Sequence, residues 1–176
     1  NSGYNDQAAY SKYGNGLSLE DWRRNNTYTL VKEVYDTIKA IKPSVEFGIS
    51  PSGIWQNKTS SYLGSETSGF ESYSRIYADT RKWVIDGIVD YIAPQLYWTI
   101  GQKGSDYAVL SEWWHNVCWE TGVKLYIGHA AYKVGTNTPQ TWQDPEEMGR
   151  QIALNRKLGN VEGSIFYGYA QIANNT

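Results

Sequence analysis

The chain has 176 residues, enough for one domain with a hydrophobic core. Charged residues make up 19% of it and the formal net charge is −2, so it offers no basic tract for nucleic acid or for an anionic membrane. No run approaches the roughly 18 consecutive apolar residues of a membrane span, and we expect neither a nucleic-acid partner nor a span.

The first half of the chain alternates loop, helix and strand patterns. Residues 1–17 are rich in Gly, Asn, Ser and Tyr without a sustained period, which predicts a lead-in loop. Ser18 has the character of an N-cap, and apolar residues at helical spacing predict a helix from there to Ile41, just before Pro43. A strand is predicted over residues 45–49. A long loop is predicted over 52–72, and a loop of this length inside a compact domain is more often functional than a simple connection.

The same alternation continues to the end of the chain. The pattern predicts helices over 73–86 and 106–121, with a strand over 91–98 between them and another over 124–129 after them. The run Asp144-Pro145-Glu146-Glu147 predicts the start of a helix that reaches residue 158, and a last strand covers 163–167. Strands that alternate with helices favour βαβ crossovers and a parallel α/β sheet.

Four strands are too few to close a parallel barrel, which needs eight. Helices on one side only would leave the other face of the sheet in water. We expect that face to be rich in Val, Ile, Leu and Ala, whose exposure would be costly. The expected partners are therefore a missing N-terminal half of a barrel, or a second copy of the chain, covering the open sheet. The chain begins with Asn1 rather than Met, and we expect this end to be a cut boundary.

Aromatic residues are abundant and unevenly distributed among types. The sequence contains 8 Trp and 15 Tyr but only 3 Phe. Trp and Tyr combine a flat apolar face with a polar tip, and a sugar has a matching apolar face and hydroxyl rim. The composition fits a carbohydrate-stacking surface, and it fits equally a helix–sheet interface filled with large rings.

The carboxyl ends of the predicted strands carry most of the candidate binding residues. In parallel α/β folds this edge holds the working site. Each of the four strand ends delivers an aromatic residue, and three also deliver a neutral hydrogen-bonding group. Gln95 and His129 have the alternative of structural hydrogen bonding, and Trp55 and Tyr169 that of rim packing. The candidate substrate-binding residues are Ser50, Trp55, Gln95, Tyr97, Trp98, His129, Tyr132 and Tyr169.

Catalytic acids are harder to assign. Glycoside hydrolysis normally uses two carboxyl groups that flank the bond. No Asp or Glu directly follows a predicted strand, and Asp90 and Glu162 precede theirs. Glu66 and Glu71 lie in the long loop, where acids are usually solvated. Asp79 could orient Arg81 or cap its helix, so this pair is kept as a possible supporting pair and the catalytic residues stay unknown.

Metal and disulfide chemistry have few candidate residues. Cys118 is the only cysteine, which excludes an internal disulfide and a cysteine-based metal site. His115 and His129 are the only histidines. No Gly-x-Gly-x-x-Gly run follows a predicted strand, so a dinucleotide has no predicted binding loop. We expect no metal and no cofactor.

Several strings resemble, in order, glycosyl hydrolase-like family 10, the YngK-like glycoside hydrolases of bacteria. The resemblance covers nearly the whole chain from about residue 18. The strings are Asp21-Trp-Arg-Arg24, Phe47-Gly-Ile-Ser-Pro51, Tyr77-Ala-Asp-Thr-Arg-Lys-Trp83, Asp90-Tyr-Ile-Ala-Pro-Gln-Leu-Tyr-Trp98, Leu125-Tyr-Ile-Gly-His-Ala-Ala-Tyr132 and Gly163-Ser-Ile-Phe166.

The resemblance implies a (β/α)8 TIM barrel in which residues 18–176 form the C-terminal half, with strands five to eight. The family's first half ends in an Asp-Asp-Tyr motif that this chain lacks, so the catalytic acids would lie outside it and the isolated fragment would be inactive. Trp55, Gln95, Tyr97, Trp98, His129 and Tyr132 would line sugar subsites. Family members are commonly secreted or attached to the cell envelope, which gives an expected extracellular or envelope location.

Two other functions stay open beside a glycoside hydrolase acting on a polysaccharide or oligosaccharide. The same aromatic platform would serve a barrel that binds carbohydrate without cleaving it. An open sheet would also suit an assembly module that pairs with a partner chain. A carboxyl pair about 5–10 Å apart in the complete protein would separate the first function from the second.

Overall fold

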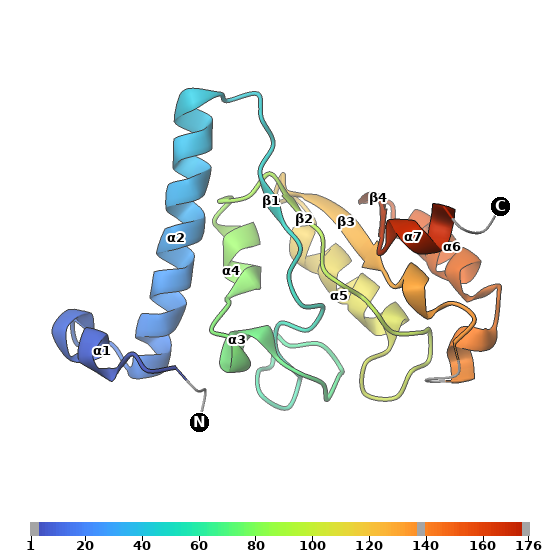
Figure 1. Ribbon diagram of the computed structural model, residues 1–176, viewed down its shortest axis with the longest axis horizontal. Helices are drawn as coiled ribbons and strands as arrows, with labels where there is room; N and C mark the ends of the chain where they lie inside the picture. Colours follow the sequence, from blue (N-terminus) through green and yellow to red (C-terminus); the bar gives the residue numbers. More distant parts are fainter. Residues whose placement is uncertain (1–3, 137–139, 174–176) are drawn as a thin grey trace.

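A computed structural model describes residues 4–136 and 140–173 of the chain. Its centre is a four-stranded parallel sheet in the order β1-β2-β3-β4, which follows the chain. The strands are β1 (Gly48–Ile49), β2 (Tyr91–Ile92), β3 (Lys124–His129) and β4 (Val161–Phe166). The predicted parallel α/β sheet is confirmed (Figure 1).

Two of the strands are shorter than predicted. β1 and β2 each have two residues, where we expected five and eight, and beyond β2 only Gln95, three residues on, forms isolated bridges to its neighbours. Gln95 bridges to Ser52 on one side and to Gly128 on the other. The parallel arrangement of the chain thus extends to Gln95, although regular pairing stops at Ile92.

The helix that begins after Ser18 follows the prediction closely. α2 spans Leu19–Ile41, and the Ser18 side chain accepts a hydrogen bond from the amide of Asp21 at 3.1 Å. The preceding segment is not the loop we expected, because α1 (Gln7–Tyr13) forms within it, while residues 1–3 lie outside the described part. Arg23 on α2 is hydrogen-bonded to Asp6, which fastens this segment to the helix.

The helix predicted over 73–86 is interrupted. It forms as α3 (Ser72–Arg75) and α4 (Thr80–Ile85). Tyr77 between them has a φ of 55°, outside the helical region, and the Asp79 carboxylate accepts from the amide of Lys82 and starts a new helix. A local capping residue therefore outweighs the continuous apolar period.

The remaining helices lie close to their predicted positions. α5 spans Tyr107–Cys118 with Asp106 as N-cap, and α6 spans Glu147–Leu158. Asp144 closes a turn by accepting from the amide of Glu146, so α6 begins at Glu147, two residues after the predicted first residue Pro145. Two 3-10 turns, η1 (Ala131–Lys133) and η2 (Gln140–Gln143), precede α6, and α7 (Tyr169–Ala173) follows β4.

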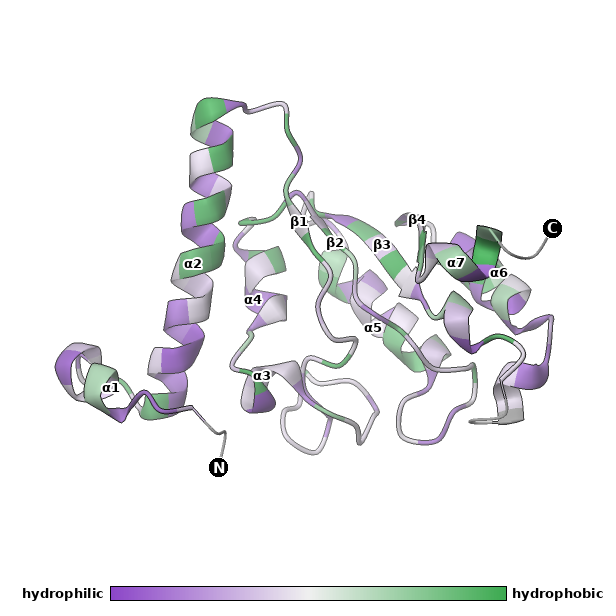
Figure 2. Cartoon of the chain, viewed as in Figure 1, coloured by the Kyte–Doolittle hydropathy of each residue, from purple (hydrophilic) through white to green (hydrophobic). Residues whose placement is uncertain are grey.

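One face of the sheet packs on helices and holds the core. Ile92, Leu125 and Ile127 are fully buried there with Leu110 and Trp114 of α5. Figure 2 shows green segments along β3, whereas α2 alternates between green and purple along its axis. Leu30 and Ile41 on α2 are 62% and 79% exposed, so part of its apolar surface is left uncovered.

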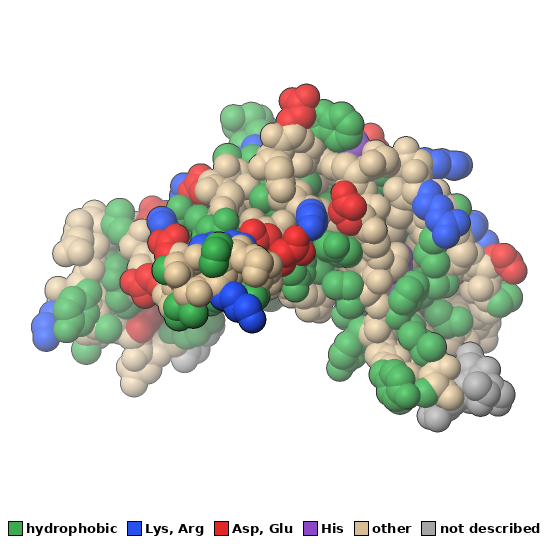
Figure 3. Space-filling view, turned by 90° about the horizontal axis from the view of Figure 1, so that it is seen from above, with side chains coloured by type: hydrophobic (Ala, Val, Ile, Leu, Met, Phe, Trp, Pro, Cys, Tyr) green, Lys and Arg blue, Asp and Glu red, His purple; other side chains and the backbone are tan. Residues whose placement is uncertain are grey.

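The other face of the sheet is concave and open. Seen from above, the molecule has an arched outline (Figure 3). Tyr91 and Tyr126 lie on this face with ring centroids 5.5 Å apart, and Gly48, Gly163 and their neighbours leave room for the rings. The expectation of a Val, Ile, Leu and Ala surface holds only in part. Ile165 lies on the open face beside the two tyrosines, but Ile92, Leu125 and Ile127 take the helix side, because side chains alternate along a strand. No helix within the described ranges is long and apolar enough to cross a bilayer.

Candidate functional site

Three tyrosines converge at the carboxyl end of the sheet. Tyr97 follows β2, Tyr132 lies in η1 after β3, and Tyr167 directly follows β4. The Tyr97 and Tyr167 rings are stacked with centroids 6.1 Å apart and planes at 16°, and the Tyr132 ring stands edge-on to both. We refer to Tyr97, Tyr132 and Tyr167 as the tyrosine cluster.

Backbone hydrogen bonds explain why the cluster forms. The Tyr167 amide donates to the carbonyl of His129, and the Tyr132 amide donates to the carbonyl of Tyr167. The parallel register of β3 and β4 therefore continues past the strand ends and brings these two rings together. Tyr167 and Tyr132 remain 62% and 39% exposed, which leaves ring surface available to a ligand.

Polar groups accompany the tyrosine cluster. Gln95 is half-buried, and its amide donates to the carbonyl of Ser50 at 3.1 Å, which links the ends of β1 and β2. The Lys133 ammonium donates to the carbonyl of Tyr97 at 2.8 Å. Burial lowers the pKa of Lys133 and raises that of Tyr97, since each charged form loses water there. The edge therefore offers phenol hydroxyls, an amide and the Lys133 side-chain nitrogen to a ligand.

A hollow of about 340 Å³ runs along the concave face below this edge. Tyr91 and Tyr126 supply rings to its lining, and Glu46, Gly163, Ser164 and Ile165 complete it. Glu46 is paired with Lys124 at the first residue of β3, the end of the strand opposite to the tyrosine cluster. On the concave face, the Tyr91 and Tyr126 rings thus line the hollow, and the Glu46–Lys124 ion pair lies at the amino end of the strands.

The structure separates two predicted site residues from the tyrosine cluster. The His129 side chain is fully buried on the helix side of β3, bonded to Gln151 of α6 and stacked on Tyr107 of α5. Trp55 is 6% exposed, stacks on Trp113 of α5 and donates its indole N–H to Asp79. Both side chains thus pack among helices instead of joining the tyrosine cluster. The alternation of strand side chains turns His129 toward the helices.

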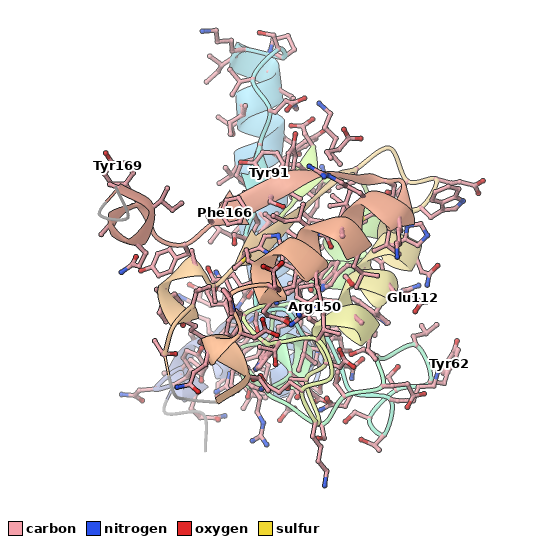
Figure 4. The ribbon with its side chains drawn as sticks, turned by 90° about the vertical axis from the view of Figure 1, so that its right-hand side faces the viewer. Tyr62, Tyr91, Glu112, Arg150, Phe166 and Tyr169 are labelled. Carbon is pink, nitrogen blue, oxygen red and sulfur yellow. The ribbon has the colours of Figure 1, made fainter. Side chains whose placement is uncertain are left out.

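Trp98 and Tyr169 also lie apart from the tyrosine cluster. Trp98 is half-buried against the hydrophobic core. Tyr169 is 83% exposed on α7 and projects outward beyond Phe166 in Figure 4. Tyr167 is a member of the cluster that the sequence did not single out as a candidate. The sequence signal for Tyr167 was its position as the last residue of the strand predicted over 163–167.

The acids considered from sequence have structural partners. Glu71 is buried, and its carboxylate accepts from Asn57 and Ser74. Burial acts to raise its pKa, but hydrogen bonds from Ser60, Ser74 and Asn57 outweigh burial and lower the pKa. Asp79 caps α4, and its carboxylate accepts a hydrogen bond from the indole N–H of Trp55. The Arg81 guanidinium lies over the Trp55 ring, 5.7 Å from its centroid. Glu66 is exposed in the long loop.

Asp90 lies at the amino end of the sheet. It accepts from the amide of Phe47 and from Lys39, both at the end where the strands begin. The part of the chain that the structure describes contains no group of three His, Cys, Asp or Glu side chains placed to hold a metal ion.

Comparison with known proteins identifies the family. The family model described as glycosyl hydrolase-like 10 matches residues 1–144. The chain is 48% identical over 173 residues to glycosyl hydrolase YngK of Bacillus subtilis (strain 168), covering 97% of this chain and 34% of that protein. It is 45% identical over 169 residues to glycosyl hydrolase DigH of Escherichia coli (strain K12), covering 93% of this chain and 38% of that protein. The chain thus spans little more than a third of the length of these relatives. The resemblance seen in the sequence is confirmed, and the chain belongs to the glycosyl hydrolase-like 10 family.

Proposed function

We propose that this chain is the C-terminal half of a (β/α)8 glycoside hydrolase and that its tyrosine cluster forms part of the glycan-binding cleft. The observation that carries the proposal is the convergence of Tyr97, Tyr132 and Tyr167 at the carboxyl ends of three successive parallel strands. This is the end at which barrels of this kind bind their ligands. Partly exposed tyrosine rings suit the apolar faces of sugars, and the phenol groups suit sugar hydroxyls.

The open surfaces support a larger barrel. Among the described residues no helix packs over the concave face with Tyr91 and Tyr126, and β1 and β4 each have one edge without a neighbouring strand. Leu30 and Ile41 expose apolar surface on α2. Relatives about three times as long supply enough chain for another four strand–helix units. In this arrangement residues 18–176 form one half-barrel, and the segment before residue 18 is its lead-in.

The proposed reaction is hydrolysis of a glycosidic bond by a carboxyl pair supplied by strands outside this chain. The acids at the sheet lie at the end opposite to the tyrosine cluster, since Asp90 precedes β2 and Glu46 precedes β1. This half would then hold the sugar while the other half cleaves it. The relatives are named glycosyl hydrolases, which supports this class of reaction. We also propose an extracellular or cell-envelope location for the protein.

The test is oligosaccharide binding by the full-length protein that carries this chain. Calorimetric titration with cellohexaose, xylohexaose and chitohexaose compares the unmodified protein with the variants Tyr97→Ala and Tyr167→Ala. Loss of one stacking ring weakens affinity by about two- to tenfold. Tyr62→Ala is the matched control, since Tyr62 is exposed on the long loop at the side opposite to Tyr169 (Figure 4). Unchanged affinity in both cluster variants, with any sugar that binds, removes the tyrosine cluster from the cleft.

A carbohydrate-binding barrel without catalysis is the second candidate. The observation that favours it is that no Asp or Glu follows any of the four strands directly. Product analysis of the full-length protein with the same sugars distinguishes the two functions. Binding without release of shorter sugars would support the second candidate, and release of shorter sugars would support the first.

A further inference from the structure

Side chains from the last third of the chain hold the segment Tyr97–Ile100, which follows β2. The carbonyl of Tyr97 accepts from Lys133 at 2.8 Å, and the carbonyl of Trp98 accepts from the Gln151 amide at 3.0 Å. The amide of Ile100 donates to the Glu147 carboxylate at 2.8 Å. Three successive peptide groups of a segment outside any regular strand are thus fixed by side chains.

Gln151 is the centre of this arrangement. It is fully buried on α6, and its amide nitrogen faces two groups that only accept, the carbonyl of Trp98 and the Glu147 carboxylate. Both N–H groups are therefore used, and the amide oxygen is the end that faces His129 at 3.0 Å. The orientation of Gln151 follows from its partners alone.

His129 completes the network, because its ring links the Gln151 amide oxygen to the Ser164 hydroxyl. Since the Gln151 oxygen accepts, the Nδ1 of His129 must carry the proton, and its Nε2 accepts from the Ser164 hydroxyl of β4 at 2.9 Å. Glu147 is also buried, and its second oxygen accepts from Arg150. Each polar atom of His129, Gln151 and Glu147 has a partner, which gives a buried network one low-energy arrangement.

We propose that Gln151 is a positioning residue that, with His129 and Glu147, holds Tyr97–Ile100 so that the Tyr97 ring joins the tyrosine cluster. This role rests on the proposed glycan-binding function. His129 then serves the site through Gln151 rather than by touching a ligand. Tyr97 is itself within the held segment, and its carbonyl is tied to Lys133 beside Tyr132. Loosening the segment would move a stacking ring without removing it.

Amide hydrogen exchange at Ile100 in the full-length protein tests the proposal without any ligand. In Gln151→Leu, protection of the Ile100 amide and its neighbours should fall by about tenfold or more, because a bond to a buried partner is lost and the segment opens locally. Asn155→Leu is the matched control. Asn155 is buried one turn along α6 and bonds Tyr107 and His129, but it does not contact residues 97–100.

Two substitutions of Glu147 distinguish a loss of the bond that holds the segment Tyr97–Ile100 from a general loss of protein stability. Glu147→Gln keeps an oxygen that accepts from Ile100 and should retain protection within about twofold, whereas Glu147→Ala should lose it as Gln151→Leu does. If Gln151→Leu does not fold, Lys133→Met removes the bond to the Tyr97 carbonyl, together with the ammonium contacts to the Tyr132 and Trp142 rings, and should raise exchange locally. Equal exchange at Ile100 in the Gln151 and Asn155 variants, or in the two Glu147 variants, overturns the proposal.

Sugar titration of the same variants keeps the two proposals apart. Weaker binding of cellohexaose, xylohexaose or chitohexaose in Gln151→Leu, with affinity kept in Asn155→Leu, supports positioning of the site. If the unmodified protein binds none of these sugars, the proposed function fails, while selective exchange at Ile100 still supports the positioning of Tyr97–Ile100.

Discussion

Replacing Trp114 with phenylalanine tests how strongly one buried hydrogen bond holds the first strand's loop to α5. Trp114 is fully buried, and its indole N–H donates to the carbonyl of Gly53 at 2.8 Å. Phenylalanine keeps an aromatic ring but cannot donate. The buried carbonyl of Gly53 then has no replacement donor from water, because the site is closed to solvent.

The expected cost follows from two contributions. A buried carbonyl without its donor costs about 1–3 kcal/mol. The smaller ring leaves a cavity on the order of 40 Å³, which at about 24 cal/mol per Å³ adds about 1 kcal/mol. We expect Trp114→Phe to lower the free energy of unfolding by about 2–4 kcal/mol, measured by urea denaturation followed by circular dichroism.

The adjacent tryptophan provides a matched control. Trp113 also donates to a carbonyl at 2.8 Å, that of Leu63, but this bond is exposed and the side chain is half-buried. Water can replace the lost donor there, so Trp113→Phe should cost less than about 1.5 kcal/mol. Equal losses in the two variants would show that burial does not set the strength of these bonds and would refute the reasoning.

Three further predictions concern packing and pH. Gly48→Ala should cost about 1–3 kcal/mol in urea denaturation, since its Cβ would lie 2.3 Å from the Tyr91 ring. Burial lowers the pKa of His129 below its ordinary 6.5, so the unfolded chain binds the proton first and the free energy of unfolding should fall as pH drops below about 6.5. Burial raises the pKa of Asp90, but its hydrogen bond from Lys39 and other favourable contacts outweigh burial and lower it below 3.8. The Asp90 carboxylate should therefore stabilise the folded protein above pH 3.8, and this stabilisation should be lost as the pH falls through the folded pKa. Urea denaturation of Asp90→Asn and of the unmodified protein at a series of pH values measures this difference.

Each of these has a control within the chain. Gly149→Ala on α6 meets only one side-chain atom at 4.0 Å and should raise stability, because alanine favours a helix more than glycine does. Gly48→Ala as stable as the unmodified protein would contradict the close approach of Tyr91. Between pH 6.5 and 5, the free energy of unfolding should fall less in His129→Gln than in the unmodified protein. An equal fall in both proteins would mean that groups other than His129 cause the pH dependence. Asp90→Asn with the same acid dependence as the parent would exclude Asp90 as its source.

Local patterns in the sequence predicted the elements that depend on neighbouring residues. Ser18 with its following acids marked the start of α2, and the apolar run over 124–129 marked β3 as the structure has it. Prediction failed where a single residue redirected the chain. Tyr77 and Asp79 divide one predicted helix into two, and residues 7–13 form a helix fastened to α2 through Arg23, a contact distant in sequence.

The sequence by itself determined the alternation of four strands with the longer helices, the parallel arrangement of the strands and the family, because these follow from periodicity, capping and residue identity. Only the tertiary structure decided which face each strand-end side chain takes. One step along β3 separates Gly128 on the open face from His129 among the helices, and no local pattern distinguishes them. The tyrosine cluster likewise depends on registers between strands more than 30 residues apart, whose pairing is set by packing rather than by neighbours in the chain.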